Sequence, residues 1–367
     1  MQKKVNLEYM NLAKELIFFW LLPFVIIRKK KGIRDINNSV LIVCPCLIGE
    51  FMATVPALRD FIRRNIDKRV DIVVTPPLRA IAERIIGIGN IYCVSSVYSR
   101  NDEDFNDADH IPRVYDHIHI LRLSSSVFHI LRHITFSHMS RNTLRFTAYV
   151  LHLWKSLLFR RTPKQWRDFN SELLGGETNH ISFDEIFSLK DIDYNAIEKF
   201  NIENISGTRV MIHTGSNWPM KKWDNEKWRE LIERINSRIP STFIFIGSNQ
   251  DLDDYEYITS RIPRVSIHSL IGKTNLLETM LLMRKCQYFI GIDSGPANMA
   301  HLSELSSLTI FGPGPHMYLP NNPNDVFIDK SRGRGLYQMF FRSRNSFIEK
   351  ITVDEAYEKV CHLMHIN

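Results

Sequence analysis

Cysteine is scarce in this chain of 367 residues, and its distribution excludes a disulfide framework. The five cysteines are an odd number and are scattered, except that Cys44 and Cys46 share an apolar run typical of a buried strand. Their spacing is not that of a zinc site either. This cysteine usage fits a reducing compartment, so we expect a cytoplasmic protein.

Long apolar runs are also missing. The main candidate, residues 16–27 (LIFFWLLPFVII), is shorter than the roughly 20 residues of a spanning helix and contains Pro23. Four cations follow it at residues 28–31, where a signal peptide would have small residues. Three interpretations stay open: a helix packed on the globular body, an interfacial helix on an anionic membrane surface, or a true span or signal. The second would make the protein peripheral on the inner face of the cytoplasmic membrane.

Repeats and low-complexity tracts are absent, and the composition is that of a folded globular protein, 44% hydrophobic and 24% charged. The chain exceeds the usual size of one hydrophobic core, so two domains are expected. Its net charge of +7 favours anionic partners such as nucleotide phosphates, nucleic acid or an anionic membrane surface. The charge alone does not choose among them.

Strands and helices alternate in two stretches of the chain, which predicts two doubly wound α/β halves with parallel sheets. In the first stretch the predicted strands cover residues 39–46, 70–75 and 91–97, and the helices 51–65 and 78–86. In the second the predicted strands cover residues 210–213, 242–247, 265–269, 288–292 and 307–311. The helices there are predicted over residues 225–239, 255–262, 276–284, 297–304 and 353–364. Ligands of such sheets bind beyond the carboxyl ends of the strands, so a cleft between the halves is the expected site.

The most specific motif covers residues 289–302 (FIGIDSGPANMAHL), a buried strand that leads through Asp293-Ser294-Gly295-Pro296 into a helix. Gly295 permits close approach of a ligand, and Pro296 suits a first helical position. The free N–H groups of the helix start would hold a phosphate, and Asp293 would accept hydrogen bonds from sugar hydroxyls. The alternative is that Asp293 or Ser294 merely caps the helix.

A second motif covers residues 211–228 (MIHTGSNWPMKKWDNEKW). A strand ends at His213, Gly215 opens a turn, and two lysines follow. A lysine at this place supplies a point charge for a diphosphate, whereas the alternative for the pair Lys221 and Lys222 is a solvated face. Core packing is the interpretation that we favour for the two tryptophans, Trp223 and Trp228.

A third motif covers residues 44–58 (CPCLIGEFMATVPAL), where Gly49 and Glu50 stand between a strand and a helix. A carboxylate at this place removes the proton from an attacking hydroxyl if it lies within hydrogen-bond reach. The alternative is a helix-start glutamate that complements the helix dipole.

In this combination and order, the motifs resemble those of glycosyltransferase family nine, the ADP-heptose:lipopolysaccharide heptosyltransferases. The family's early motif, Gly and an acidic residue before a "PAL" helix, matches Gly49, Glu50 and Pro56-Ala57-Leu58. Its middle motif, H-x-G followed by K-x-W, matches His213, Gly215, Lys221 and Trp223. Its late motif, D-[ST]-G-x-x-H followed by a strand and G-P, matches Asp293, Ser294, Gly295 and Phe311-Gly312-Pro313. Residues 272–278 (GKTNLLE) resemble the family's approach to the nucleotide pocket.

The resemblance implies the GT-B fold, with two Rossmann-like domains facing a central cleft, and an inverting reaction without a metal ion. The sugar, a heptose or a related one, would pass from a nucleotide-diphosphate donor such as ADP-heptose to a lipopolysaccharide core or another surface glycan. No cofactor beyond the donor and no nucleic-acid partner are expected. Glu50 would be the catalytic base of a single displacement, and the diphosphate would leave against Lys221 and the helix start.

The sequence pattern predicts a domain organisation, and the resemblance implies the role of each domain and a set of donor-binding residues. Residues 1–35 would form an apolar and basic helix, 36–195 the acceptor-side domain with an insertion at 99–178, 208–350 the nucleotide-sugar domain, and 351–367 a C-terminal helix. The donor-binding set is Gly49, His213, Gly215, Lys221, Asp293, Ser294, Gly295 and Asn298. An acid after Gly247 is expected to bind the ribose, and Asp251 is our choice.

The chain departs from the family pattern at two positions. The usual base is Asp where this chain has Glu50, and the histidine of the late motif is replaced by Asn298, with His301 one turn further on. Two other functions stay open, of which the departures support the second. A sugar-nucleotide epimerase on the same fold would turn over free donor without an acceptor. A non-catalytic sugar-nucleotide-binding protein would bind donor with no reaction.

Overall fold

The computed structural model describes residues 38–94, 107–122, 127, 130–131, 134–139, 159, 164–314, 317–319, 322–331 and 347–366. The chain forms two compact units. The first comprises the described residues of Met1–Tyr149, Arg167–Ile181 and Glu185–Ser188, and the second those of Val150–Trp166, Ser182–Asp184 and Leu189–Asn367. The predicted N-terminal helix and the apolar run at residues 16–27 lie outside the described residues. Within the described residues, no helix is both long enough and apolar enough to cross a membrane.

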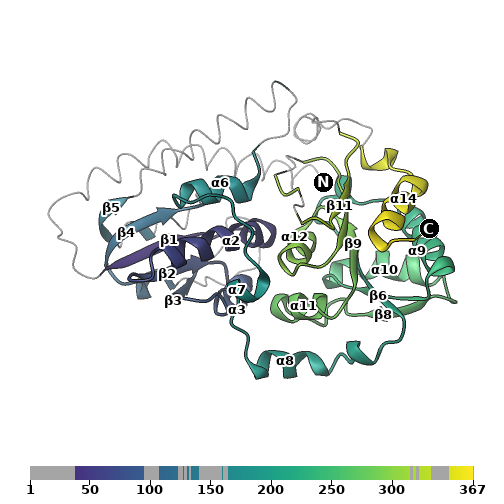
Figure 1. Ribbon diagram of the computed structural model, residues 1–367, viewed down its shortest axis with the longest axis horizontal. Helices are drawn as coiled ribbons and strands as arrows, with labels where there is room; N and C mark the ends of the chain where they lie inside the picture. The colour runs from purple at the N-terminus through teal and green to yellow at the C-terminus, as the bar shows by residue number, and fades with distance from the viewer. Residues whose placement is uncertain are drawn as a thin grey trace. The chain divides into compact units, whose positions relative to one another are not determined.

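The first unit contains a five-stranded parallel sheet (Figure 1). Its strand order is β3-β2-β1-β4-β5, with every neighbouring pair parallel. The strands are β1 (Ser39–Val43), β2 (Arg69–Val74), β3 (Ile88–Cys93), β4 (Val114–Ile120) and β5 (Thr135–Met139). Helix α2 (Ile48–Arg64) connects β1 to β2, and two shorter helices are α3 (Arg79–Ala82) and α6 (Trp166–Leu173), whose first residue is assigned to the second unit. Helix α7 (Phe183–Ile186) is divided, with its last two residues in this unit and its first two in the second. The predicted strand, helix, strand succession of residues 39–75 is confirmed.

Strands β4 and β5 come from the segment in which the sequence shows no alternating pattern. Strand β4 reads VYDHIHI and pairs with the central strand β1, so this part of residues 99–178 belongs to the sheet itself. The sequence pattern does not reveal this strand, because polar residues interrupt its apolar run. One of them, Asp116, is buried, and its Oδ2 accepts a hydrogen bond from the backbone N–H of Ser39 at 2.8 Å. A buried carboxylate with a backbone donor is stable in a strand, yet it interrupts the apolar signal.

The second unit contains a six-stranded parallel sheet with the order β11-β10-β9-β6-β7-β8. This is the strand order of a Rossmann sheet read from its far edge. The strands are β6 (Thr208–His213), β7 (Ser241–Phe245), β8 (Ser266–Ser269), β9 (Tyr288–Ile292), β10 (Ser307–Ile310) and β11 (Val326–Ile328). The first five were predicted, whereas β11 was not. The order changes direction between β6 and β9, and their carboxyl ends are where doubly wound sheets bind ligands.

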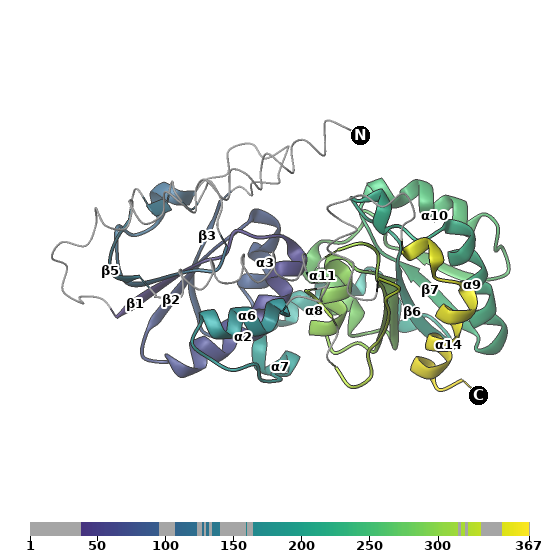
Figure 2. The same ribbon diagram turned by 90° about the horizontal axis from the view of Figure 1, so that it is seen from above.

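Helices cover both faces of this second sheet (Figure 2). Helices α9 (Asn225–Arg238), α10 (Leu252–Thr259) and α14 (Val353–Met364) lie on one face, and α11 (Leu276–Met283) and α12 (Gly295–Leu302) on the other. Helix α8 (Asp191–Glu198) precedes the sheet in the chain. Asp224 caps α9, since its carboxylate accepts hydrogen bonds from the N–H groups of Glu226 and Lys227. Comparison of these bounds with the predicted ranges confirms most of the predicted helices of this unit, with ends shifted by a few residues.

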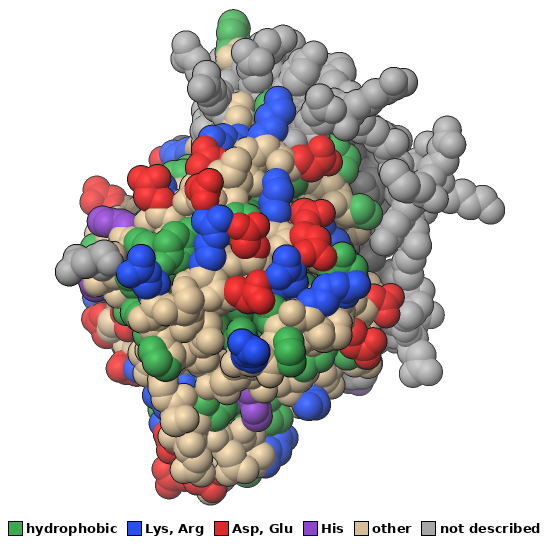
Figure 3. All heavy atoms as spheres, turned by 90° about the vertical axis from the view of Figure 1, so that its right-hand side faces the viewer, with side chains coloured by type: hydrophobic (Ala, Val, Ile, Leu, Met, Phe, Trp, Pro, Cys, Tyr) green, Lys and Arg blue, Asp and Glu red, His purple; other side chains and the backbone are tan. Residues whose placement is uncertain are grey.

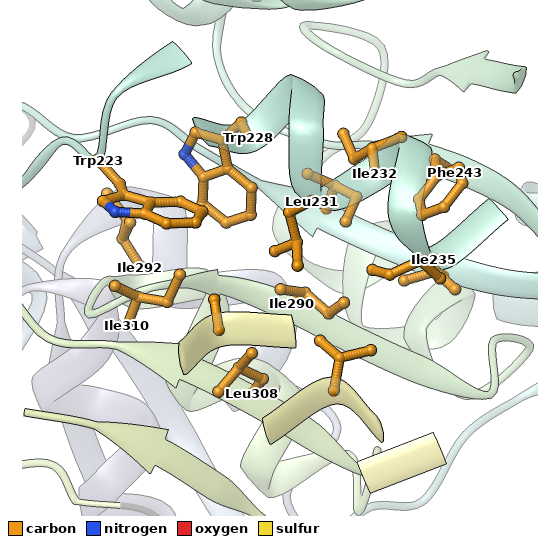
Figure 4. Packing of buried hydrophobic residues seen from close by; sticks show 14 of the residues in the cluster. Trp223, Trp228, Leu231, Ile232, Ile235, Phe243, Ile290, Ile292, Leu308 and Ile310 are labelled. Atoms are coloured by element: carbon orange, nitrogen blue, oxygen red, sulfur yellow. The ribbon is translucent and has the colours of Figure 1, made fainter. Parts of the chain in front are cut away.

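The core of the second unit lies between the sheet and helices α9 and α14 (Figure 4). Trp223 and Trp228 pack edge to face there, with ring centroids 5.2 Å apart. The Trp223 indole N–H donates to the carbonyl of Ile351 at 3.1 Å, so the ring is both packed and hydrogen-bonded. The core assignment of both tryptophans is confirmed, and neither belongs to the site.

The outer side of α9 is a solvated, mixed-charge surface. Arg229 pairs with Glu226 and Glu233, and Arg234 pairs with Glu230 and with Asp354 of α14. Acidic and basic side chains are interspersed over the face of the molecule shown in Figure 3. Part of the chain's basic content is therefore balanced locally on this surface.

Candidate active site

An ion pair between Lys221 and Asp293 is the centre of the candidate site in the second unit. Lys221 follows β6 in a short helical turn, and Asp293 directly follows β9, the neighbouring strand. The lysine Nζ lies 2.6 Å from Oδ2 of Asp293, and the two side chains are 20% and 8% exposed. Lys221 of the second sequence motif and Asp293 of the first, 72 residues apart in the chain, therefore meet at one edge of the sheet.

The loop after β10, which contains Gly312 and Gly314, lies against this pair. A Cβ added at Gly312 would lie 2.9 Å from the Cα of Lys221, closer than real Cβ atoms approach backbone. Gly314 lies near the charged groups, since a Cβ there would be 3.6 Å from Nζ of Lys221 and 3.7 Å from Oδ2 of Asp293. The G-P element of the late motif thus has a steric reason: Gly312 leaves room for the backbone of Lys221.

The neighbouring Lys222 has a different partner. Its ammonium pairs with Asp254 of α10, whose other carboxylate oxygen accepts from Asn225 Nδ2 at 3.0 Å. The two lysines therefore differ in their surroundings. One cation belongs to the candidate site, and the other ties the start of α9 to α10.

Ser294 and His213 meet beside the ion pair, at the start of α12. The Oγ of Ser294 lies 3.1 Å from Nδ1 of His213 and 3.0 Å from the carbonyl oxygen of Ile292. Burial lowers the pKa of His213 to about 4, against an opposing effect of Asp251, so the imidazole is neutral at pH 7. Ser294 occupies the N-cap position of α12, yet no side chain caps this helix. The predicted alternative of a capping serine is therefore not realised.

Asn298, which replaces the family's histidine, lies inside the first turn of α12. Its Nδ2 donates to the carbonyl of Ser294 at 3.0 Å, and only 9% of the residue is exposed. His301 is directed elsewhere, with Nε2 3.4 Å from Oγ1 of Thr309. Asn298 therefore stabilises the helix start, while a contact of Asn298 with the donor stays a prediction.

Asp251 is held by its own turn. Its Oδ2 accepts hydrogen bonds from the N–H of Ser248 at 2.8 Å and from the Ser248 hydroxyl at 3.1 Å. The carboxylate packs against two glycines, because a Cβ at Gly215 would lie 2.0 Å from Oδ1 and one at Gly247 2.6 Å from Oδ2. Gly215 is thus required by the close approach of Asp251. The ribose-binding role of this acid stays a prediction.

The segment of residues 272–278 forms a turn and the start of α11. Gly272 has φ +67°, and a Cβ there would lie 1.9 Å from Oδ1 of Asn249, so both backbone and space demand glycine. Asn275 and Glu278 cap α11 reciprocally, and Glu278 also pairs with Lys199 at 2.7 Å. Elsewhere in this unit, Asp191 and Asp193 lie in the first turn of α8, and Asp193 accepts a hydrogen bond from the N–H of Lys190 at 2.9 Å.

Glu50 lies in the first unit, in the first turn of α2 after β1. Its Oε2 accepts the N–H of Leu47 at 3.2 Å, and its Oε1 lies 3.3 Å from Nη1 of Arg122. The Glu50 side chain is 11% exposed and that of Arg122 15%. Thr54 donates to the carbonyl of Glu50 at 2.7 Å and is itself held by Asn170. Glu50 therefore lies where a carboxylate complements the dipole of α2, and it also forms an ion pair. Its catalytic role stays a prediction.

Arg122 is the residue that sequence reasoning missed. It stands two residues beyond the end of β4, in the segment without a recognisable pattern. The one signal in the sequence would have been β4 itself, since a parallel neighbour of β1 ends at the same sheet edge as the Glu50 turn.

Cys44 and Cys46, also at this edge, are buried free thiols with Sγ atoms 3.4 Å apart, as expected for a pair without a disulfide.

The chain is similar in sequence to known proteins over part of its length. A family model described as Glycosyltransferase family 9 (heptosyltransferase) matches residues 185–333, which include Lys221 and Asp293 but not Glu50. The chain is 28% identical to lipopolysaccharide heptosyltransferase 3 of Escherichia coli (strain K12) over 110 residues, 30% of this chain and 32% of that protein. It is 30% identical to lipopolysaccharide heptosyltransferase 1 of Campylobacter coli over 110 residues. The matched stretch thus spans about a third of the length of these curated relatives.

Solved structures show the same fold over nearly the whole chain. A glycosyl transferase family 9 protein from Veillonella parvula superposes with a TM-score of 0.70 at 14% identity, covering 91% of this chain and all of the other. The E. coli heptosyltransferase WaaC with ADP gives a TM-score of 0.60 at 16% identity, covering 89% and 99%. The iron-containing dodecameric glycosyltransferase TibC of E. coli gives 0.52 at 14% identity, covering 89% and 76%. The predicted GT-B fold is confirmed, and residues 185–333 match the model of glycosyltransferase family 9 (heptosyltransferase).

Proposed function

We propose that the chain is a glycosyltransferase that moves a sugar from a nucleotide-diphosphate donor to a lipopolysaccharide core or another surface glycan. The observation that carries the proposal is the ion pair of Lys221 and Asp293 at the carboxyl edge of the second sheet, inside the family segment. The names of the two relatives and the ADP in a similar structure support a heptose and ADP as sugar and nucleotide.

The proposed reaction is a single displacement. Glu50 takes the proton of an acceptor hydroxyl while that oxygen bonds to the anomeric carbon of the donor sugar. The bond from this carbon to the diphosphate breaks, its electron pair stays on the diphosphate oxygen, and the anomeric configuration inverts. Lys221 and the N–H groups at the start of α12 stabilise the departing charge. When the diphosphate engages Lys221, Asp293 becomes available to the hydroxyls of the sugar.

We propose that this reaction needs no metal ion, because a lysine and a helix start supply the charge that a metal would otherwise supply. Both groups are present at the same sheet edge. Retention of full transfer activity in the presence of a chelator is the expected result. Loss of activity on chelation, restored by iron, would overturn this part of the proposal.

A transfer assay tests the proposed function. The protein is incubated with ADP-heptose and with lipopolysaccharide that lacks its outer heptose, and the product linkage is determined by NMR. We expect a new glycoside with the anomeric configuration opposite to that of the donor. Retained configuration would contradict the displacement. Turnover of the donor without acceptor would point to an epimerase, and binding without any reaction to a sugar-nucleotide-binding protein.

We also propose that residues 16–31 attach the protein to the inner face of the cytoplasmic membrane. The apolar run followed by Arg28 and three lysines supports an interfacial helix on anionic lipid. In a flotation assay the full chain should float with vesicles that contain anionic lipid. Replacing the four cations with glutamine should abolish flotation, whereas a full chain that never floats would contradict the attachment.

A further inference from the structure

Ser294 stands where a serine normally caps a helix. It precedes α12 with an extended backbone, φ −159° and ψ 174°, which is the N-cap conformation. A capping serine accepts a hydrogen bond from the second or third helical N–H. The second residue of α12 is Pro296, which has no N–H, so Ala297 offers the one N–H that Ser294 could cap.

The hydroxyl of Ser294 instead contacts the last residues of two neighbouring strands, Ile292 of β9 and His213 of β6. Its single proton goes to the carbonyl of Ile292, at 3.0 Å, on β9. The contact with Nδ1 of His213, at 3.1 Å, is then satisfied when the imidazole carries its proton on Nδ1 and donates to Oγ. His213 is the last residue of β6, which pairs with β9, so the imidazole donates to the serine from the adjacent strand.

This arrangement leaves two N–H groups in the first turn of α12 without acceptors. Within the described part of the chain, neither Gly295 nor Ala297 finds a hydrogen-bond partner for its N–H. Ala297 is only 1% exposed. Buried N–H groups without partners are rare in folded proteins, so the N–H of Ala297, together with the N–H of the partly exposed Gly295, is available to an anionic ligand beside Lys221.

We propose that His213 is a positioning residue for the donor diphosphate: by holding the Ser294 hydroxyl, it keeps that hydroxyl away from Ala297 and leaves the helix start open to the anion. The inference rests on the proposed function. His213 does not attract the diphosphate by charge, because the buried imidazole is neutral at pH 7. Its effect on the donor therefore passes through Ser294.

A double-mutant cycle with ADP as the probe tests this role by calorimetric titration. His213→Phe should weaken ADP binding about fivefold, since the freed hydroxyl caps Ala297. In a Ser294→Ala background the same substitution should change the affinity less than twofold, because no hydroxyl is left to cap the helix. His213→Asn, which keeps a donor near the Nδ1 position, should bind like the wild type. A His213→Phe effect that is equally large in both backgrounds would overturn the proposal.

A crystal structure without ligand decides the same point independently of donor binding. In the wild type Oγ of Ser294 should contact His213, and in His213→Phe it should lie within hydrogen-bond distance of the Ala297 nitrogen. Failure of ADP to bind the wild type would count against the proposed function while leaving this structural test in force. A wild-type crystal in which Ser294 already caps Ala297 would overturn the positioning role, even if the Phe variant does not fold.

Discussion

Glu50 and Arg122 form a largely buried ion pair in the first unit, with Oε1 and Nη1 3.3 Å apart. The second carboxylate oxygen accepts the N–H of Leu47, so each oxygen has a donor. The pair joins the first turn of α2 to the segment that follows β4, the strand next to β1. A carboxylate fixed in this way has one orientation, which general base catalysis requires.

Glu50→Gln should reduce the rate of sugar transfer by about 10²–10⁴-fold, the usual contribution of general base catalysis. The amide oxygen still accepts from Leu47, but the side chain cannot take a proton. Donor affinity should barely change, because Lys221 and Asp293, the centre of the proposed donor site, belong to the second unit. Single-turnover transfer and a donor titration measure the two effects separately.

Glu50→Asp is the matched variant, because it keeps the carboxylate and restores the family's usual residue. The shorter side chain withdraws the carboxylate from Arg122 by about 1.5 Å, so partial activity is expected, above Gln and below Glu. Nearly full turnover of Glu50→Gln, under conditions where chemistry limits the rate, would remove Glu50 from the mechanism.

Lys221→Ala should weaken the binding of a nucleotide diphosphate at least several-fold, because the anion loses its cation. Lys222→Ala is the control, since Lys222 pairs with Asp254 of α10 and the proposed site does not use it. Titration with ADP should separate the two neighbouring lysines. Equal losses, or a larger loss for Lys222→Ala, would show that Lys221 is not the diphosphate ligand.

Gly312→Ala should lower both the thermal stability and the ADP affinity, because its Cβ would lie 2.9 Å from the Cα of Lys221 and displace that segment. Gly314→Ala should keep a melting temperature close to that of the wild type, since its nearest neighbours would be at ordinary contact distances of 3.6 Å and more. Thermal unfolding of the two variants checks this difference. A Gly312→Ala protein as stable as Gly314→Ala would contradict the packing described for the loop.

His213 should make stability depend on pH below neutrality. Burial lowers its pKa from 6.5 to about 4, so the unfolded chain binds the proton more readily than the folded one. The corresponding stability is fully present above pH 6.5 and is lost as the pH falls towards 4, by up to about 3 kcal/mol. Denaturant unfolding of the wild type should show this loss, and His213→Asn, which does not titrate, should lack it. Parallel curves for the two proteins would contradict a buried neutral imidazole.

The sequence predicted the second unit more fully than the first. Strands β6, β7 and β9 are short runs of buried β-branched and aromatic residues, and signals such as Asp224 mark the helix that follows. Strand β4 escaped prediction because Asp116 and two histidines alternate with its apolar residues. A buried polar side chain is stable when the fold supplies a partner, and that partner, the N–H of Ser39, lies 77 residues away.

The residues of the candidate site were more predictable than their contacts. Local patterns singled out Lys221, Asp293 and Ser294, because each follows a strand end. That Lys221 pairs with Asp293, and that Ser294 turns to His213 instead of capping α12, depends on the order of strands in the sheet. Arg122 could not be found at all without β4.

Binding of nucleotide sugars is the most direct test of the central claim, that the Lys221–Asp293 site holds a nucleotide-diphosphate sugar. The full chain is screened by thermal unfolding against a panel of nucleotide sugars that includes ADP-heptose. A true donor, present at 100 times its dissociation constant, stabilises the folded protein by about 2.7 kcal/mol, and this shift should shrink in Lys221→Ala. Unchanged melting with every nucleotide sugar, or a shift that Lys221→Ala leaves intact, would contradict the account.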